Sequence, residues 1–152
     1  DAIRNILHAK IQGELLDFYY EYLPEMIRNY TLKENVIEVI DRLRSKGHKI
    51  VVITARGATV KNGLVEITKE YFKKHNISVD KIIFETVHKV DACLENKVDL
   101  MIDDSIKVLD NIRAAGINTL LFSSTVNKDI NTDINRVENW LELEKYIADL
   151  CE

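Results

Sequence analysis

Lys49-Ile-Val-Val-Ile-Thr-Ala-Arg56 is the stretch of the sequence that says most about its fold. Its β-branched, apolar run predicts a strand over residues 49–53 that is buried on both faces of a parallel sheet. The run ends abruptly in a polar turn at Thr54. Ligands of open α/β sheets bind at the carboxyl ends of the strands. The hydroxyl of Thr54 and the guanidinium of Arg56 are therefore well suited to bind an anionic group such as phosphate.

A second stretch, Val98-Asp-Leu-Met-Ile-Asp-Asp-Ser105, has the same form. It predicts a strand over residues 98–102 that is followed directly by the carboxylates of Asp103 and Asp104. One strand thus ends in a hydroxyl and a guanidinium, and the other ends in two carboxylates. This combination indicates a phosphate and a divalent cation that bind side by side. Taken alone, the two aspartates have a simpler interpretation, since they could only cap the helix that begins near Ser105.

Helices and strands alternate around these stretches, which predicts an α/β fold. We expect a Rossmann-like three-layer α/β/α sandwich with a parallel sheet, and a small helical cap at the amino-terminal end. The predicted units are a cap segment, residues 1–30, and an α/β core, residues 31–152.

The apolar pattern also predicts the individual elements. The expected strands are residues 49–53, 82–84, 98–102 and 117–122. The expected helices cover residues 36–43, 64–75, 90–94, 105–115 and 136–150, with a polar loop over residues 123–135. Gly47 and Gly116 are well placed to follow the ends of two of these helices.

The cap segment is the most aromatic part of the chain. Its apolar residues recur at spacings of three and four, which is typical of helices, and Pro24 is expected to end one helix or open the next. Its aromatic residues are Phe18, Tyr19, Tyr20, Tyr22 and Tyr30. We expect them to pack between helices; the functional alternative is a ring that stacks on a substrate base.

Composition restricts the class of partner and the compartment. The 152 residues suit one domain with a sizeable core, and the net charge of −4 gives no support for nucleic acid or an anionic membrane as a partner. Cys93 and Cys151 are far apart and are expected to be free thiols rather than a disulfide or zinc ligands. We see neither a signal peptide nor an apolar run long enough to cross a bilayer, so we expect a cytoplasmic protein. An exposed aromatic cap face could support a homodimer.

The order of three features along the chain resembles that of the haloacid dehalogenase (HAD) superfamily of phosphotransferases. They are Ile53-Thr54-Ala-Arg56, then Lys89, then Asp103-Asp104, each near the carboxyl end of a predicted strand. Within the superfamily, the chain is most similar to the 5′(3′)-deoxyribonucleotidases and related bacterial nucleotidases. The likeness covers most of the chain, including a closing helix with Trp140.

The resemblance implies a Mg²⁺-dependent phosphomonoester hydrolase, a 5′-nucleotidase acting on (deoxy)nucleoside monophosphates. It implies that Thr54 hydrogen-bonds a phosphoryl oxygen, that Lys89 neutralises charge on the phosphate and the nucleophile, and that Asp104 binds Mg²⁺. Asp103 would bind the metal through water or support the other ligands. Arg56 would hold the substrate phosphate or tie its loop to the cap. The implied substrate-binding residues are Thr54, Ala55, Arg56 and Lys89, and the implied metal ligands are Asp103 and Asp104.

One part of the superfamily's pattern is absent. These enzymes use an aspartate nucleophile in a D-x-D-x-[TV] motif at the end of an amino-terminal strand, and no such motif occurs here. We expect the nucleophile to lie outside the given sequence, so that the sheet also lacks the strand that normally lies next to residues 49–53 and 98–102. The alternative is a catalytically inactive HAD-like protein that binds phosphate or metal. A receiver-like signalling domain is less favoured, because its acidic pair would come near the start of the chain.

Overall fold

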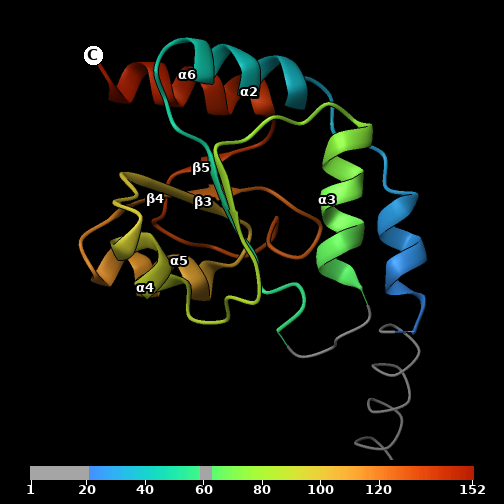
Figure 1. The fold of residues 1–152 in the computed structure, drawn as a ribbon. Helices are drawn as coiled ribbons and strands as arrows, with labels where there is room; N and C mark the ends of the chain where they lie inside the picture. The colour runs from blue at the N-terminus through green and yellow to red at the C-terminus, as the bar shows by residue number, and fades with distance from the viewer. Residues whose placement is uncertain (1–20, 59–62) are drawn as a thin grey trace, which may run out of the picture.

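The strands of the protein form two small parallel sheets. The computed structural model describes residues 21–58 and 63–152. One sheet pairs β1 (Val51–Ile53) with β2 (Lys81–Ile83), and the other has the order β3 (Leu100–Asp103), β4 (Asn118–Phe122) and β5 (Arg136–Val137) (Figure 1). The short β-branched runs therefore form parallel strands, as predicted.

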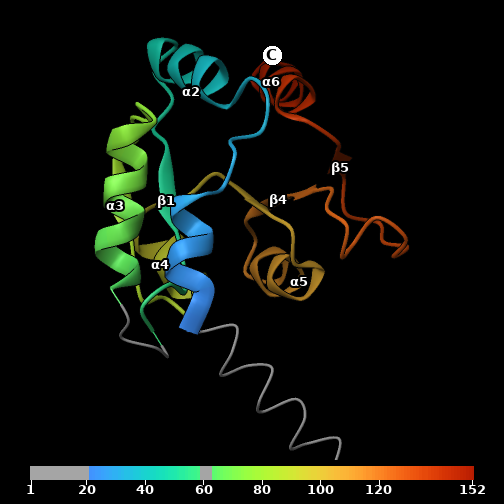
Figure 2. The same cartoon turned by 90° about the vertical axis from the view of Figure 1, so that its right-hand side faces the viewer.

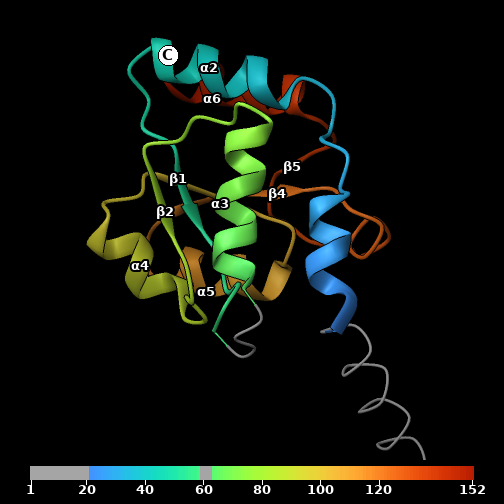
Figure 3. The ribbon, with the colours of Figure 1, turned by 45° about the vertical axis from the view of Figure 1, so that its right-hand side comes forward.

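Helices cover both faces of the strands. They are α2 (Val36–Ser45), α3 (Leu64–Lys74), α4 (Lys89–Glu95), α5 (Ile106–Ala114) and α6 (Trp140–Leu150). In Figures 1 and 3, α2 and α6 lie together on one side of the strands, and α4 and α5 lie on the other. The predicted α/β/α arrangement of layers is confirmed.

Apolar residues of β3 and β4 alternate between the two helical layers. Met101 and Leu121 belong to a core that contains Leu109 of α5. Leu120 belongs to a second core, together with Leu143 of α6. Because successive side chains of a strand point to opposite faces, each strand buries apolar residues on both sides. This two-sided burial explains why the strands read as continuous apolar runs in the sequence.

The two sheets share a core but no backbone ladder. Ile53 of β1 packs in the same apolar core as Met101 of β3. Within the described residues, however, β1 pairs only with β2, and β3 pairs only with β4. In Figure 2, β4 lies to the right of β1. The interruption falls at the position where the resemblance led us to expect a further strand.

The prediction of a helix over residues 136–150 is wrong for its first turn. Residues 136–137 instead pair with the end of β4 as strand β5, and α6 begins at Trp140. The reason is the side chain of Asn139, whose Oδ1 accepts a hydrogen bond from Glu142 N at 2.9 Å and so caps the helix. The other helix ends agree with prediction: Gly47 and Gly116 follow α2 and α5 with φ of 92° and 87°.

The described part of the cap segment is a helix over residues 21–28. Pro24 lies inside this helix, which differs from the predicted helix boundary at that residue. The helix lies beside α3 in Figures 1 and 2, and a small apolar cluster joins the two: Leu23, Ile27, Leu64 and Ile67. Leu23 and Ile27, on either side of Pro24, bury their side chains in this cluster and so stabilise the helix against α3. Phe18, Tyr19 and Tyr20 lie outside the described residues.

Both cysteines are free thiols, as expected. Cys93 is buried against Met101, with 3.8 Å between the sulfur atoms, and Cys151 is exposed. In the parts of the chain that the structure describes, every helix is too short or too polar to cross a membrane.

Candidate active site

The carboxyl ends of β1 and β3 carry the residues that the sequence singled out. Thr54 follows β1, Asp103 ends β3, and Asp104 is the next residue. Lys89 begins α4, just after the loop that leaves β2. Thr86 N, in that loop, donates to Thr54 O at 3.0 Å, so the segments that follow β1 and β2 are hydrogen-bonded to one another. The loop that leads to Lys89 is thereby joined to the residue that follows β1.

Lys89 and Asp103 form an ion pair across residues that are 14 positions apart in the sequence. Lys89 Nζ lies 2.7 Å from Asp103 Oδ2, and the two side chains are 18% and 9% exposed. The other carboxylate oxygen, Oδ1, accepts a hydrogen bond from Ser105 N at 2.9 Å. Both oxygens of Asp103 therefore have a donor, and the Lys89 ammonium group is held beside the end of β3.

Asp104 has a perturbed carboxyl group. Its pKa is raised, first because the surrounding protein removes part of its hydration, and then because Asp103 accepts its hydrogen bond and repels its charge. The residue is nevertheless exposed, so a ligand from solvent can reach it. Lys89 acts in the opposite direction and lowers the pKa. A cation bound beside Asp104 would add to that effect and favour its charged form.

The carboxylates of Asp103 and Asp104 are oxygen ligands of the kind that Mg²⁺ prefers. In residues 21–58 and 63–152, no group of three or more His, Cys, Asp and Glu side chains lies close enough to hold a metal. Zinc sites generally need three or four such ligands. Mg²⁺ keeps several waters and is bound through one or two carboxylates together with substrate phosphate. Asp104 and Asp103 are the side chains that could contribute to such a site.

The loop after β1 is held firmly around Thr54. Thr54 N donates to Ile83 O at 2.9 Å, and Arg56 N donates to Thr54 Oγ1 at 3.2 Å. Because a hydroxyl has one donor hydrogen in addition to its lone pairs, Thr54 can still donate to an anion. Gly57 has φ of 84°, and a Cβ there would lie 2.9 Å from Val65 Cγ2. The backbone at Gly57 therefore lies close to α3.

Arg56 ties this loop to α3. Its Nη1 donates to Thr68 Oγ1 at 3.0 Å, and Thr68 is only 2% exposed. The helix of residues 21–28 also packs against α3, but this partner of Arg56 is on α3 itself, so the predicted tie to the cap stays a prediction. Ala55 is exposed at the turn between Thr54 and Arg56, and the roles of Ala55 and Arg56 in substrate binding stay predictions.

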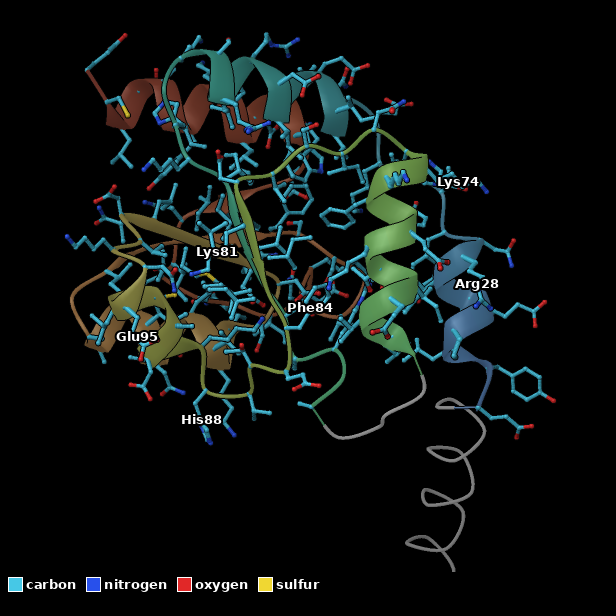
Figure 4. The ribbon with its side chains drawn as sticks, viewed as in Figure 1. Arg28, Lys74, Lys81, Phe84, His88 and Glu95 are labelled. Carbon is cyan, nitrogen blue, oxygen red and sulfur yellow. The ribbon has the colours of Figure 1, made fainter. Side chains whose placement is uncertain are left out.

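Sequence reasoning missed Asn127. It lies in the segment predicted to be a polar loop, but its side chain is 2% exposed and donates to Asp104 O at 2.8 Å. Asn and Asp are common in this segment, so composition alone does not distinguish the buried amide from its exposed neighbours. His88, next to Lys89, is exposed and points away from the molecule (Figure 4).

The fold is that of the HAD superfamily. It is similar to the crystal structure of a HAD-superfamily hydrolase from Ehrlichia chaffeensis, with a TM-score of 0.59 and 18% sequence identity over 95% of this chain and 77% of that chain. No curated protein matches the sequence. The chain belongs to the family described as 5′ nucleotidase, deoxy (pyrimidine), cytosolic type C protein (NT5C), whose model matches residues 4–151. It is thus a HAD-type member of the nucleotidases and phosphatases.

Proposed function

We propose that the protein is a Mg²⁺-dependent phosphomonoester hydrolase that acts on nucleoside or deoxynucleoside monophosphates in the cytoplasm. The observation that carries the proposal is the Lys89–Asp103 ion pair with Asp104 directly beside it. Thr54 follows β1, a strand of the other parallel sheet. Family membership supports the nucleotide as substrate.

The side chains have complementary roles in phosphoryl transfer. The reaction spreads negative charge over the equatorial oxygens of the transferred phosphoryl group, and fixed positive charge and donors stabilise it. Lys89 supplies the charge and Thr54 the hydroxyl donor. Asp104, assisted by Asp103, would hold Mg²⁺, which when bound supplies further positive charge to the phosphate oxygens. Asp103 keeps Lys89 in position through the 2.7 Å contact.

The interrupted sheet supports a place for the nucleophile. Thr54 and Asp103 lie at the carboxyl ends of β1 and β3, the strands on either side of the interruption. A parallel strand paired with both would end between them. An aspartate at its end would lie next to the phosphate and metal groups, as the superfamily's covalent mechanism requires.

The test is phosphate release from a panel of nucleoside monophosphates by the full-length protein, with Mg²⁺ or with EDTA. We expect Mg²⁺-dependent turnover that Asp104→Asn abolishes while the fold is retained. Asp110→Asn is the matched control, because Asp110 is an exposed acid on α5 whose partner is Arg113. Turnover that persists in EDTA or in Asp104→Asn would refute the metal site. Binding of Mg²⁺ and phosphate without turnover of any ester would favour the inactive HAD-like alternative.

A further inference from the structure

We infer that Asn127 is a positioning residue for the metal-binding carboxylate, and that Arg136 holds it in place. The inference rests on the proposed function and adds residues from the loop between β4 and β5 to that site. Asn127 is 2% exposed. A buried amide needs hydrogen-bond partners for its donors and acceptor, so the identity of those partners indicates what the residue does.

Every hydrogen-bonding position of the Asn127 amide is occupied. Its Nδ2 donates to Asp104 O at 2.8 Å and to Phe122 O at 2.9 Å. Its Oδ1 accepts from Ser124 N at 3.1 Å and from Arg136 Nη1 at 2.8 Å. An amide side chain has two donor hydrogens and two lone pairs, so no capacity is left. One side chain thereby joins the ends of β3 and β4 to the beginning of β5.

The bond to Asp104 acts on the peptide group between Asp104 and Ser105. Asn127 holds the carbonyl of this peptide, and Asp103 Oδ1 holds its N–H, at 2.9 Å from Ser105 N. Because a peptide group is planar, fixing both ends fixes its orientation. The Cα of Asp104 belongs to the same plane, so the direction in which its carboxylate projects is also restricted.

Arg136 secures the loop that carries Asn127. Besides the bond to Asn127 Oδ1, its Nη1 donates to Ser123 Oγ at 3.2 Å. Its Nη2 donates to Asn127 O at 3.2 Å and to Ile130 O at 3.0 Å. A guanidinium is planar and permanently charged, so it holds side chain and backbone together. Arg136 is therefore a rigid support behind Asn127.

This support matters because Mg²⁺ requires near-ideal octahedral geometry. A ligand carboxylate that is displaced by more than about 0.5 Å no longer meets that requirement well. Removal of groups that orient metal ligands typically weakens metal affinity or activity by about 10–100-fold. We expect an effect of that size when the Asn127 amide is removed, although Asn127 itself does not touch the metal.

The experiment measures Mn²⁺ affinity in the full-length protein from the electron paramagnetic resonance signal of the free ion. Mn²⁺ prefers the same oxygen ligands as Mg²⁺. Asn127→Ala should raise the dissociation constant about tenfold or more. Arg136→Lys, a milder change that removes the guanidinium fork, should raise it severalfold. Ser124→Ala is the matched control: the Ser124 hydroxyl is buried in the same loop and has no hydrogen-bond partner among the described residues, so affinity should not change.

The outcomes separate this inference from the proposed function. A folded Asn127→Ala protein that binds Mn²⁺ within about twofold of wild type, while Asp104→Asn does not bind it, would overturn the positioning role alone. If Asn127→Ala does not fold, Arg136→Lys decides in the same way. Absence of Mn²⁺ binding by the wild-type protein would overturn both proposals. In turnover assays, a positioning role should lower kcat and leave KM nearly unchanged, whereas a purely structural role should lower only the melting temperature.

Discussion

Lys89→Met is expected to destabilise the metal-free protein by about 2.5 kcal/mol. Removing one partner of a buried ion pair costs about 3–5 kcal/mol, because the remaining charge is left without compensation. With side chains 18% and 9% exposed, the Lys89–Asp103 pair belongs at the lower end of that range. Loss of a cation from the first turn of α4 returns about 0.5 kcal/mol through the helix dipole. At about 2–4 °C per kcal/mol for a domain of this size, the melting temperature should fall by about 5–10 °C.

The assay is thermal unfolding followed by circular dichroism, in EDTA and then in excess Mg²⁺. Mg²⁺ should raise the melting temperature of Lys89→Met more than that of wild type, because the cation then compensates two adjacent carboxylates that have lost their lysine. Lys107→Met, at an exposed position on α5, controls for the loss of one positive charge. The double variant Lys89→Met/Asp103→Asn should recover most of the lost stability, because it no longer carries an unpaired carboxylate. The amide oxygen introduced at position 103 can still accept a hydrogen bond from Ser105 N.

A melting temperature for Lys89→Met within about 1 °C of wild type in EDTA would refute the reasoning. It would mean that the ion pair does not form in solution or that water already compensates Asp103. A double variant no more stable than Lys89→Met would show that the loss came from packing of the lysine stem rather than from the unpaired carboxylate.

Two further predictions concern the neighbouring residues. Asp104→Asn should raise the melting temperature in EDTA at neutral pH. The folded-state pKa of Asp104 is raised, so the contribution of Asp104 to stability falls as pH rises through that pKa. The gain in melting temperature from Asp104→Asn should therefore disappear in acid. A gain that does not depend on pH would contradict this cause. Thr54→Val should lower kcat by about 100-fold, as loss of one donor to a transition-state oxygen does. Thr54→Ser keeps the hydroxyl and should retain activity. If steady-state assays show equal losses for both variants, the hydroxyl is not the donor.

The sequence was sufficient to predict the strands because their burial on both faces leaves a continuous apolar signal. The runs before Thr54 and Asp103 show this most clearly. The sequence also singled out Lys89 and Asp103, and these two side chains form an ion pair. That Thr54 acts at the same site stays a prediction. The limits of the elements were predicted within a few residues, apart from the first turn of the closing helix.

Other features depend on contacts that leave no local pattern. β5 has only two residues, too few to show alternation, and its pairing with β4 depends on a partner far from it in the sequence. Asn127 is buried because four hydrogen bonds from distant segments converge on it, and nothing in its immediate neighbours indicates this. The tie from Arg56 to Thr68 is of the same kind, because it depends on how α3 packs against the loop.

The interrupted sheet has a consequence for how stability is distributed along the backbone. Among the described strands, only β4 has a neighbour on each side, and its residues Leu120 and Leu121 are inaccessible to solvent. Its amide protons should exchange with deuterium only through the largest unfolding events. β1 and β3 each have an open edge in the described structure, and such edges readily accept another strand. Slow exchange at β4 and faster exchange at β1 would show that one part of the molecule is more stable than the other, with the Lys89–Asp103 ion pair where the two parts meet.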